Sequence, residues 1–285
     1  MLEHEALGSK QKFWYRDPDS DTDWLFKFPR PGTGEHWAEK IAAEVAAHLR
    51  LSHALVELAE FDGTFGSTTL SFASRSGELI HGNQILVGNV LGYDPDRRFR
   101  NSDHTLANIR LGVKKVFEEE AAARRAMSQF GGYLVLDALI GNTDRHHENW
   151  GVLRSSSNAH LPVVAPSFDH ASSLGRELSD DGGAKSRERL LTADRMGEYA
   201  RKARGGIYWS EQDAHGISPL DLVRRAAAAC PELVKAGFEK LRDLEREVME
   251  DIVDRIPSDW MTPIARRFAL ELMCYSLKEM RKLPQ

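Results

Sequence analysis

A polar segment that separates a long apolar helix from a hairpin constrains this chain more than any other feature. Residues 120–141 carry the spacing of a helix, and residues 150–164 predict a hairpin around a serine-rich turn. The run between them, Gly141-Asn-Thr-Asp-Arg-His-His-Glu-Asn149, is almost entirely polar. A second polar element, Ser167-Phe-Asp-His170, leaves the far side of the hairpin. Because a hairpin reverses the chain, the sequence predicts that these two elements lie side by side.

Three side chains in these elements suit the transfer of a phosphoryl group. Asp144 and Asn149 are five residues apart, and Asp169 follows 20 residues later. Amide and carboxylate oxygens are the hard ligands that Mg²⁺ takes, and a separate carboxylate can accept the proton of an attacking hydroxyl. Protein kinases use the same order of base Asp, metal-binding Asn and metal-binding Asp. The alternative interpretation is a chance set of polar residues in loops.

Zinc is a second interpretation of the same segment, through His146, His147 and Glu148. Adjacent histidines point in different directions, and the sequence places no third ligand beside them. Cys230 and Cys274 are the only cysteines, too few for a cysteine-based zinc site or a secreted disulfide framework. A zinc site is therefore not expected.

The N-terminal part contains a lysine in an otherwise apolar strand. Lys27 follows Trp24-Leu-Phe26, and a lysine placed there needs an acidic partner and a phosphate group. A helix over residues 35–51 would supply the acid, and helical geometry alone does not choose between Glu39 and Glu44. The alternative is an edge-strand lysine whose amine reaches solvent.

A short glycine-containing loop precedes this strand. Leu7-Gly-Ser-Lys10 lies between the first two predicted strands, where backbone amides can face phosphate oxygens. The loop is shorter and poorer in glycine than that of protein kinases. A simple hairpin turn is an equally good interpretation when the loop is judged alone.

The predicted elements divide the chain into two lobes of an α+β fold. Residues 1–73 contain strands and one helix, which predicts a small nucleotide-binding lobe, and residues 74–285 predict a mostly helical catalytic lobe. A cleft between two lobes is where a ligand is expected.

Composition excludes several classes of protein. Hydrophobic residues make up 41% of the 285 residues, which argues against disorder. The net charge of −5 gives no basic field, so direct nucleic-acid binding is not expected. The basic segment 185–204 could dock an acidic or RNA-bound substrate, but a solvated helix face is the favoured interpretation. No apolar run is long enough to span a membrane, so a cytoplasmic protein without a membrane partner is expected.

Together these motifs resemble a known family. Asn142-Thr-Asp-Arg-His-His-Glu-Asn149 and Ser167-Phe-Asp-His-Ala-Ser-Ser-Leu174 are similar to the HipA-like serine/threonine kinases of bacterial toxin–antitoxin systems. Asp144-Arg-His-x-x-Asn149 also resembles the catalytic loop of phosphatidylinositol kinases. The similarity extends through Gly8-Ser-Lys10 and Trp37-Ala-Glu-Lys40. The resemblance implies a two-lobed, protein-kinase-like fold.

It also implies a role for each matching residue. Asp144 would be the catalytic base, and His146 would help neutralise the transferred charge. Asn149 and Asp169 would bind Mg²⁺. The residues implied to bind ATP are Gly8, Ser9 and Lys10 in the phosphate loop, Lys27 with Glu39 as its preferred partner, and Ser71, Phe72 and Ala73 in the hinge that meets adenine.

The implied function is that of an ATP-dependent serine/threonine protein kinase, of the toxin type and able to phosphorylate itself, with Ser9 as the matching hydroxyl. HipA-type toxins carry an extra N-terminal subdomain, so a shorter form is expected here, with an antitoxin or a separate subdomain-like protein as partner. Two alternatives stay open. One is a kinase for a lipid headgroup or small molecule, and the other is a non-catalytic nucleotide-binding module.

Overall fold

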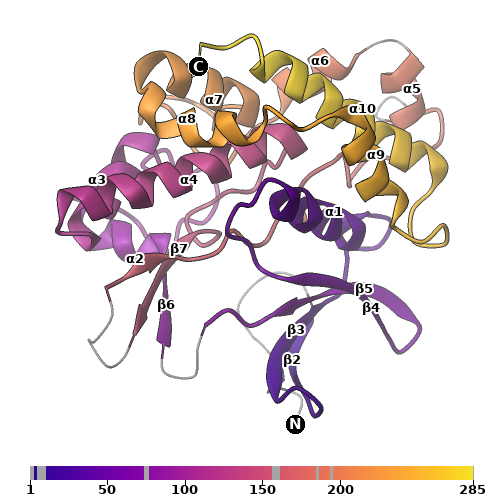
Figure 1. The fold of residues 1–285 in the computed structure, drawn as a ribbon, viewed down its shortest axis with the longest axis horizontal. Coiled ribbons are helices and arrows are strands. Elements are labelled where there is room, and N and C mark those ends of the chain that lie inside the picture. The colour runs from indigo at the N-terminus through magenta and orange to yellow at the C-terminus, as the bar shows by residue number, and fades with distance from the viewer. Residues whose placement is uncertain are drawn as a thin grey trace.

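The computed structural model describes residues 3–4, 11–73, 77–155, 161–183, 186–192 and 195–284 of the chain, residues 3–4 by their backbone alone. Two antiparallel sheets lie beside a group of helices (Figure 1). The strands are β1 (Glu3–His4), β2 (Lys12–Asp17), β3 (Thr22–Lys27), β4 (Val56–Phe61), β5 (Thr64–Leu70), β6 (Gly77–His81), β7 (Gly151–Ser155) and β8 (Val163–Val164). The helices are α1 (Glu35–His48), α2 (Gly82–Val87), α3 (Leu106–Val116), α4 (Glu120–Ile140), α5 (Arg187–Thr192), α6 (Met196–Lys202), α7 (Pro219–Ala229), α8 (Pro231–Lys240), α9 (Arg246–Asp254) and α10 (Pro263–Met280).

The first sheet has the strand order β1-β2-β3-β5-β4, and α1 packs against β4 and β5. Lys27 stands opposite Lys12 of β2 on one side and Ser67 of β5 on the other. β3 is therefore an interior strand, and the interpretation of Lys27 as an edge-strand lysine is wrong. Because side chains alternate along a strand, Lys27 and Ser67 share one face of the sheet, whereas the rings of Phe13 and Phe26 stack on the other.

The second sheet contains the expected hairpin and one strand that the sequence did not indicate. β7 pairs with β8 through Val152 and Val164, as the hairpin predicts. β7 also pairs with β6, and α2 follows β6 directly. The strand and the helix in residues 77–87 are only five and six residues long, and segments this short show no clear apolar periodicity. The sequence therefore did not predict them.

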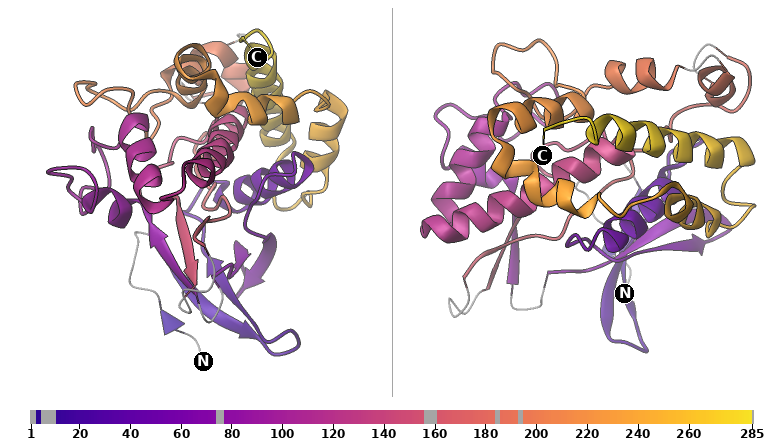
Figure 2. Two further views of the ribbon diagram at one scale, coloured as in Figure 1. Left: turned by 60° about the vertical axis from the view of Figure 1, so that its left-hand side comes forward. Right: turned by 45° about the horizontal axis from the view of Figure 1, so that its top comes forward.

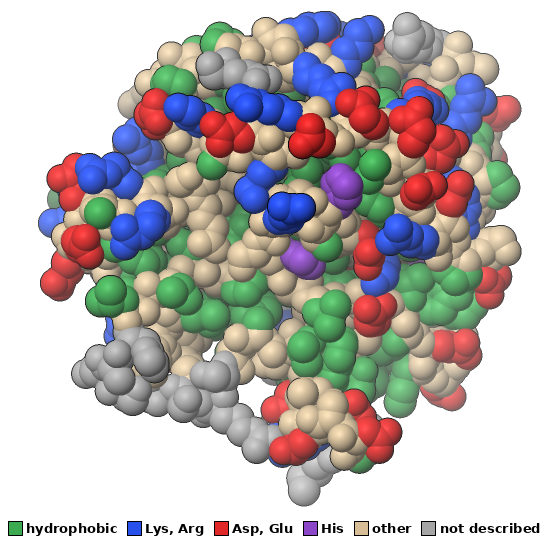
Figure 3. Space-filling view, viewed as in Figure 1, with side chains coloured by type: hydrophobic (Ala, Val, Ile, Leu, Met, Phe, Trp, Pro, Cys, Tyr) green, Lys and Arg blue, Asp and Glu red, His purple; other side chains and the backbone are tan. Residues whose placement is uncertain are grey.

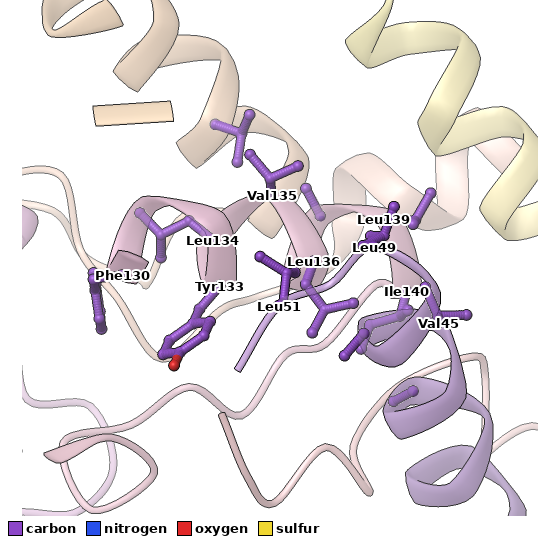
Figure 4. Packing of buried hydrophobic residues seen from close by; sticks show 14 of the residues in the cluster. Val45, Leu49, Leu51, Phe130, Tyr133, Leu134, Val135, Leu136, Leu139 and Ile140 are labelled. Atoms are coloured by element: carbon purple, nitrogen blue, oxygen red, sulfur yellow. The ribbon is translucent and has the colours of Figure 1, made fainter. Parts of the chain in front are cut away.

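α4 lies at the centre of the helical part (Figures 1 and 4). Every residue from Phe130 to Ile140 is buried, as expected for a helix surrounded by others. α4 and α8 approach closely at Gly131, where a Cβ atom would lie 1.7 Å from the carbonyl oxygen of Leu233. The same cluster of buried side chains includes Val45 of α1, so α1 shares the core of the helical part.

Figure 2 shows α1 between the first sheet and the C-terminal helices. α1 packs against α9, and Trp260, which precedes α10, stacks on Phe65 of β5 with ring centroids 4.1 Å apart. None of the helices in the described ranges combines the length and the apolar character needed to cross a bilayer.

Candidate active site

The polar segment after α4 is folded by hydrogen bonds between its own residues. Gly141 ends the helix with a φ of 66°, a left-handed conformation that suits glycine. The Asp144 amide then donates to Asn142 Oδ1 at 3.1 Å, and Asn149 Nδ2 donates to the Asp144 carbonyl at 2.7 Å. The predicted base and the predicted metal ligand Asn149 are thus fixed to each other through the backbone of one turn.

Arg145 anchors this turn to the protein interior. Its guanidinium donates to both carboxylate oxygens of Asp137 on α4, each at 2.8 Å, and to the Asn149 carbonyl at 2.7 Å. Both side chains of the Arg145–Asp137 pair are buried. Burial opposes the charge on Arg145, but the carboxylate of Asp137 outweighs it and raises the pKa of the guanidinium.

The same guanidinium reaches the second polar element. Arg145 Nη2 donates to Ser167 Oγ at 2.9 Å, and Ser167 Oγ lies 2.7 Å from His170 Nε2. Asp169 lies between these two residues with a φ of 56°, a conformation that is uncommon for a residue other than glycine. Arg145 therefore joins the turn that carries Asp144 and Asn149 to the loop that carries Asp169.

Lys27 brings the sheet to the same place. Its Nζ donates to Glu39 Oε1 at 2.9 Å and to Asp169 Oδ1 at 3.3 Å. Burial opposes the ammonium charge, but the carboxylates of Asp169 and Glu39 together raise the pKa of Lys27. Glu39 also accepts from Ser67 Oγ at 3.3 Å. Between the two acids that the sequence left open, Glu39 is the partner of Lys27, since Glu44 pairs with Lys40 instead at 2.7 Å.

His146 lies beside the predicted base. Its Nε2 is 4.0 Å from Asp144 Oδ1 and 3.1 Å from Arg98 Nε. Burial and the charge of Arg98 lower the pKa of His146 to about 3, although Asp169 opposes this shift. The ring is therefore neutral near pH 7, and it can contribute to a reaction as a hydrogen-bonding group rather than as a cation.

Ser172 contacts Asp144 and is itself contacted by Arg176, two residues that the sequence did not single out. Ser172 Oγ donates to Asp144 Oδ2 at 3.4 Å, and Arg176 Nη2 donates to Ser172 Oγ at 3.2 Å. Arg176 Nη1 also pairs with Glu35 of α1 at 2.5 Å. A chain of polar contacts thus runs from the first turn of α1 to Asp144.

The predicted hinge residues follow β5. The Ser71 amide donates to the Asp23 carbonyl at 2.8 Å, so this amide is occupied by β3. The ring of Phe72 lies 5.3 Å from that of Phe168, next to Asp169. Thr69 shares the sheet face of Ser67 and Lys27, and its buried Oγ1 has no hydrogen-bond partner in the described part of the chain. The predicted phosphate loop, Gly8, Ser9 and Lys10, lies outside the described residues.

The side chains fit magnesium and a nucleotide better than zinc. Asn149 Nδ2 is held by the Asp144 carbonyl, and no donor of the described residues reaches Asn149 Oδ1. This oxygen and the Asp169 carboxylate are hard ligands that leave most of a magnesium shell to water and phosphate. A cluster of three histidine, cysteine or acidic ligands is absent from the described ranges. The Thr69 hydroxyl, two residues before the predicted hinge, is buried without a partner among the described residues, which fits a polar ligand at this position.

A comparison with protein families decides the affiliation of the chain. The model of the HipA-like C-terminal domain matches residues 5–260. The chain belongs to this family. Membership in this family confirms the resemblance that was based on residues 142–149 and 167–174. None of the curated protein sequences is significantly similar to the chain.

Solved structures confirm the predicted two-lobed, protein-kinase-like α+β fold. The proinflammatory kinase CtkA of Helicobacter pylori superposes with a TM-score of 0.77 at 19% sequence identity, over 98% of this chain and 93% of CtkA. HipA of Shewanella oneidensis MR-1, solved with HipB and operator DNA, gives a TM-score of 0.61 at 12% identity. That match covers 98% of this chain and 65% of HipA. Family and fold together support a kinase, a phosphotransferase.

Proposed function

We propose that the chain is an ATP-dependent serine/threonine protein kinase. The observation that carries the proposal is the contact of Lys27 with both Glu39 and Asp169, because it joins the sheet, α1 and the loop after the hairpin at one point. A lysine held by a helix acid beside a metal-binding aspartate is the arrangement that positions ATP phosphates in kinases. Nucleotide would bind between residues 1–73 and 74–285, with Phe72 and Thr69 beside the adenine ring.

Each side chain then has a task in the transfer. Lys27 holds the phosphates, and its ammonium remains charged because the carboxylates stabilise it. Asp144, whose side chain is 35% exposed, orients the acceptor hydroxyl and takes its proton while the oxygen–phosphorus bond forms and the bond from the γ-phosphorus to the bridging oxygen breaks. Asn149 and Asp169 would hold Mg²⁺, which supplies neutralisation of phosphate charge. Neutral His146 would offer a hydrogen bond at the edge of the site.

Intact-mass analysis after incubation with MgATP tests this function. Transfer to the protein itself adds about 80 Da per phosphoryl group. Peptide mapping would then locate the modified hydroxyl, for which we propose Ser9. The variant Asp144→Asn keeps the size of the side chain but removes the base, so it should abolish the mass increase and leave the unfolding transition unchanged. A folded Asp144→Asn protein that still modifies itself would contradict the role of Asp144.

We further propose a toxin-type kinase of the cytoplasm that a protein antitoxin restrains. The support is family membership and the structure of HipA with HipB and operator DNA. Expression of the chain with and without co-expressed neighbouring genes, followed by growth measurement, tests this role. Growth arrest that requires Asp144 would support it, and normal growth at high levels of active kinase would contradict it.

A further inference from the structure

The loop that joins α2 to α3, residues 88–105, is fastened to the turn that carries the base. Arg98 Nε lies 3.1 Å from His146 Nε2 and 3.1 Å from Glu148 Oε2. The guanidinium of Arg98 also lies over the ring of Phe99, 5.5 Å from its centroid, and this ring meets His146 edge-on at 6.0 Å. The loop therefore has a fixed position beside the site where a hydroxyl must approach Asp144.

The outer side of this loop carries apolar and cationic side chains that face solvent. Phe99 is 63% exposed. Of the eight large hydrophobic side chains exposed in the described ranges, Leu91 and Phe99 lie in this loop, Val87 ends α2 directly before it, and Leu111 lies on α3 directly after it. Such a concentration on one short stretch is unusual for a surface without a partner.

Arg97 and Arg100 lie within two residues of Phe99 in the same loop. Both are exposed, and neither forms an ion pair or side-chain hydrogen bond with any residue that the structure describes. Asp94 and Asp96 precede them, but Asp94 accepts from the Asp96 amide at 3.0 Å and neither acid pairs with these arginines. The half-buried Arg98, in contrast, is already paired with Glu148. Two unpaired cations and an exposed ring within four consecutive residues suit an acidic segment that also carries an apolar side chain.

We propose that Arg97, Phe99 and Arg100 form a docking surface for an acidic segment of the protein substrate. The proposal rests on the protein kinase function proposed above and adds the chemistry of its acceptor. Three residues of extended chain span about 10 Å. Since Phe99 contacts His146 and His146 lies 4.0 Å from Asp144, the acidic side chains belong within about three residues of the acceptor hydroxyl.

A peptide array with a central serine or threonine tests the proposal. Each flanking position is occupied in turn by an acidic, a neutral or a basic residue, and phosphorylation by the whole chain with MgATP is measured. We expect a preference for Asp or Glu within three positions of the hydroxyl.

In the double variant R97E/R100E, KM for the best acidic peptide should rise about tenfold. The variant should at the same time prefer basic peptides, which shows directly that it is folded and active. F99A should raise KM about threefold for acidic peptides with an apolar neighbour.

The matched control is K235E/R267E, which reverses two exposed charges on α8 and α10 and should leave the acidic preference unchanged. Equal use of acidic and basic peptides by the unaltered protein would overturn the proposal, as would an acidic preference that survives in R97E/R100E. Stronger inhibition of peptide phosphorylation by a short RNA than by a competing acidic peptide would also overturn it. ATP turnover without modification of any peptide would refute the docking surface but leave the phosphotransferase intact. No turnover of ATP would refute both.

Discussion

Two cations, one buried and one mostly buried, join distant segments of this protein, and they differ in what surrounds them. Arg145 is 3% exposed and its partner Asp137 4%, and all three guanidinium nitrogens donate to protein acceptors. Lys27 is 13% exposed, and of its two partners Glu39 is buried whereas Asp169 is 29% exposed. We call the first arrangement closed because both of its side chains are buried, and the second open because Asp169 is partly exposed.

This difference distinguishes the residues that hold the candidate site in place from the residues that would contact its ligand. The closed pair fixes the turn of Asp144 to the loop of Asp169 through Ser167. The open group presents an ammonium and a carboxylate, which suit the ligand proposed above because it carries both phosphate and metal. Removal of a closed partner should therefore cost stability, whereas removal of an open partner should cost activity.

Arg145→Met should have the largest effect. It leaves the Asp137 carboxylate buried without a counter-charge, which typically costs about 3–5 kcal/mol of unfolding free energy. Urea denaturation measures this loss. The double variant R145M/D137L, with an apolar pair in place of the charges, should recover most of it. Arg246→Met, which breaks the exposed pair with Glu271, is the control and should change the midpoint little. An Arg145→Met protein as stable as that control would remove the basis of the comparison.

Asp169→Asn should show the opposite behaviour. Loss of the carboxylate that faces Lys27 and the proposed metal should lower phosphoryl transfer about 100- to 1000-fold, or about 3–4 kcal/mol in the barrier. Since Lys27 keeps Glu39, the unfolding free energy should change by less than about 1 kcal/mol. Initial rates with MgATP and urea denaturation of the same preparation supply both numbers. A large loss of stability with little loss of rate would mean that Asp169 supports the fold rather than the ligand.

His104 extends the comparison to a closed group without charge. Its Nδ1 lies 2.7 Å from the Gly206 carbonyl, and its Nε2 accepts from Trp150 Nε1 at 3.1 Å. Burial lowers the pKa of His104 to about 3. Below pH 6.5, His104 binds a proton in the unfolded chain but not in the folded protein. The unfolding free energy therefore falls as the pH falls, by about 1.4 kcal/mol per pH unit from this group.

Unfolding free energies at pH 7, 6 and 5 measure that slope. His104→Asn should reduce the slope between pH 6 and 5 by about 1.4 kcal/mol relative to the unaltered protein. Identical slopes for the variant and the unaltered protein would show that His104 gains its proton in the folded protein.

Ser172→Ala should have the smallest effect. The hydroxyl contacts Asp144 at the long distance of 3.4 Å, so its loss should lower kcat about fivefold, or about 1 kcal/mol, with little change in KM. Ser173→Ala is the neighbouring control, because that hydroxyl donates to the His170 carbonyl instead. Equal rates for both variants would show that the polar contacts from Glu35 to Asp144 do not affect the reaction.

The sequence predicted the fold and family well because the informative residues are close together in it. Asp144 and Asn149 lie in one turn, and the hairpin that brings Asp169 back is short. The α+β fold follows from strand and helix periodicities that are long enough to recognise, whereas β6 and α2 are too short. Contacts between distant segments, such as Arg98 with His146 and Arg176 with Glu35, leave no periodic signal.

One missed residue did have a signal in the sequence. Asp137 is the single charged residue in the apolar stretch from Phe130 to Ile140, and a carboxylate in such a helix needs a buried cation. Arg145, eight residues later, is the nearest candidate downstream. Helical periodicity did not separate Glu39 from Glu44, and only the family resemblance favoured Glu39 at the level of sequence. In the structure, the packing of α1 on β5 decides that Glu39 meets Lys27.

A crystal structure of the protein with Mg²⁺ and a non-hydrolysable ATP analogue tests the central claim most directly. We expect the metal to be bound by Asn149 Oδ1 and the Asp169 carboxylate, with Lys27 Nζ on a phosphate oxygen and the Asp144 carboxylate facing the γ-phosphate. A nucleotide bound elsewhere, or a metal that touches neither Asn149 nor Asp169, would contradict the account.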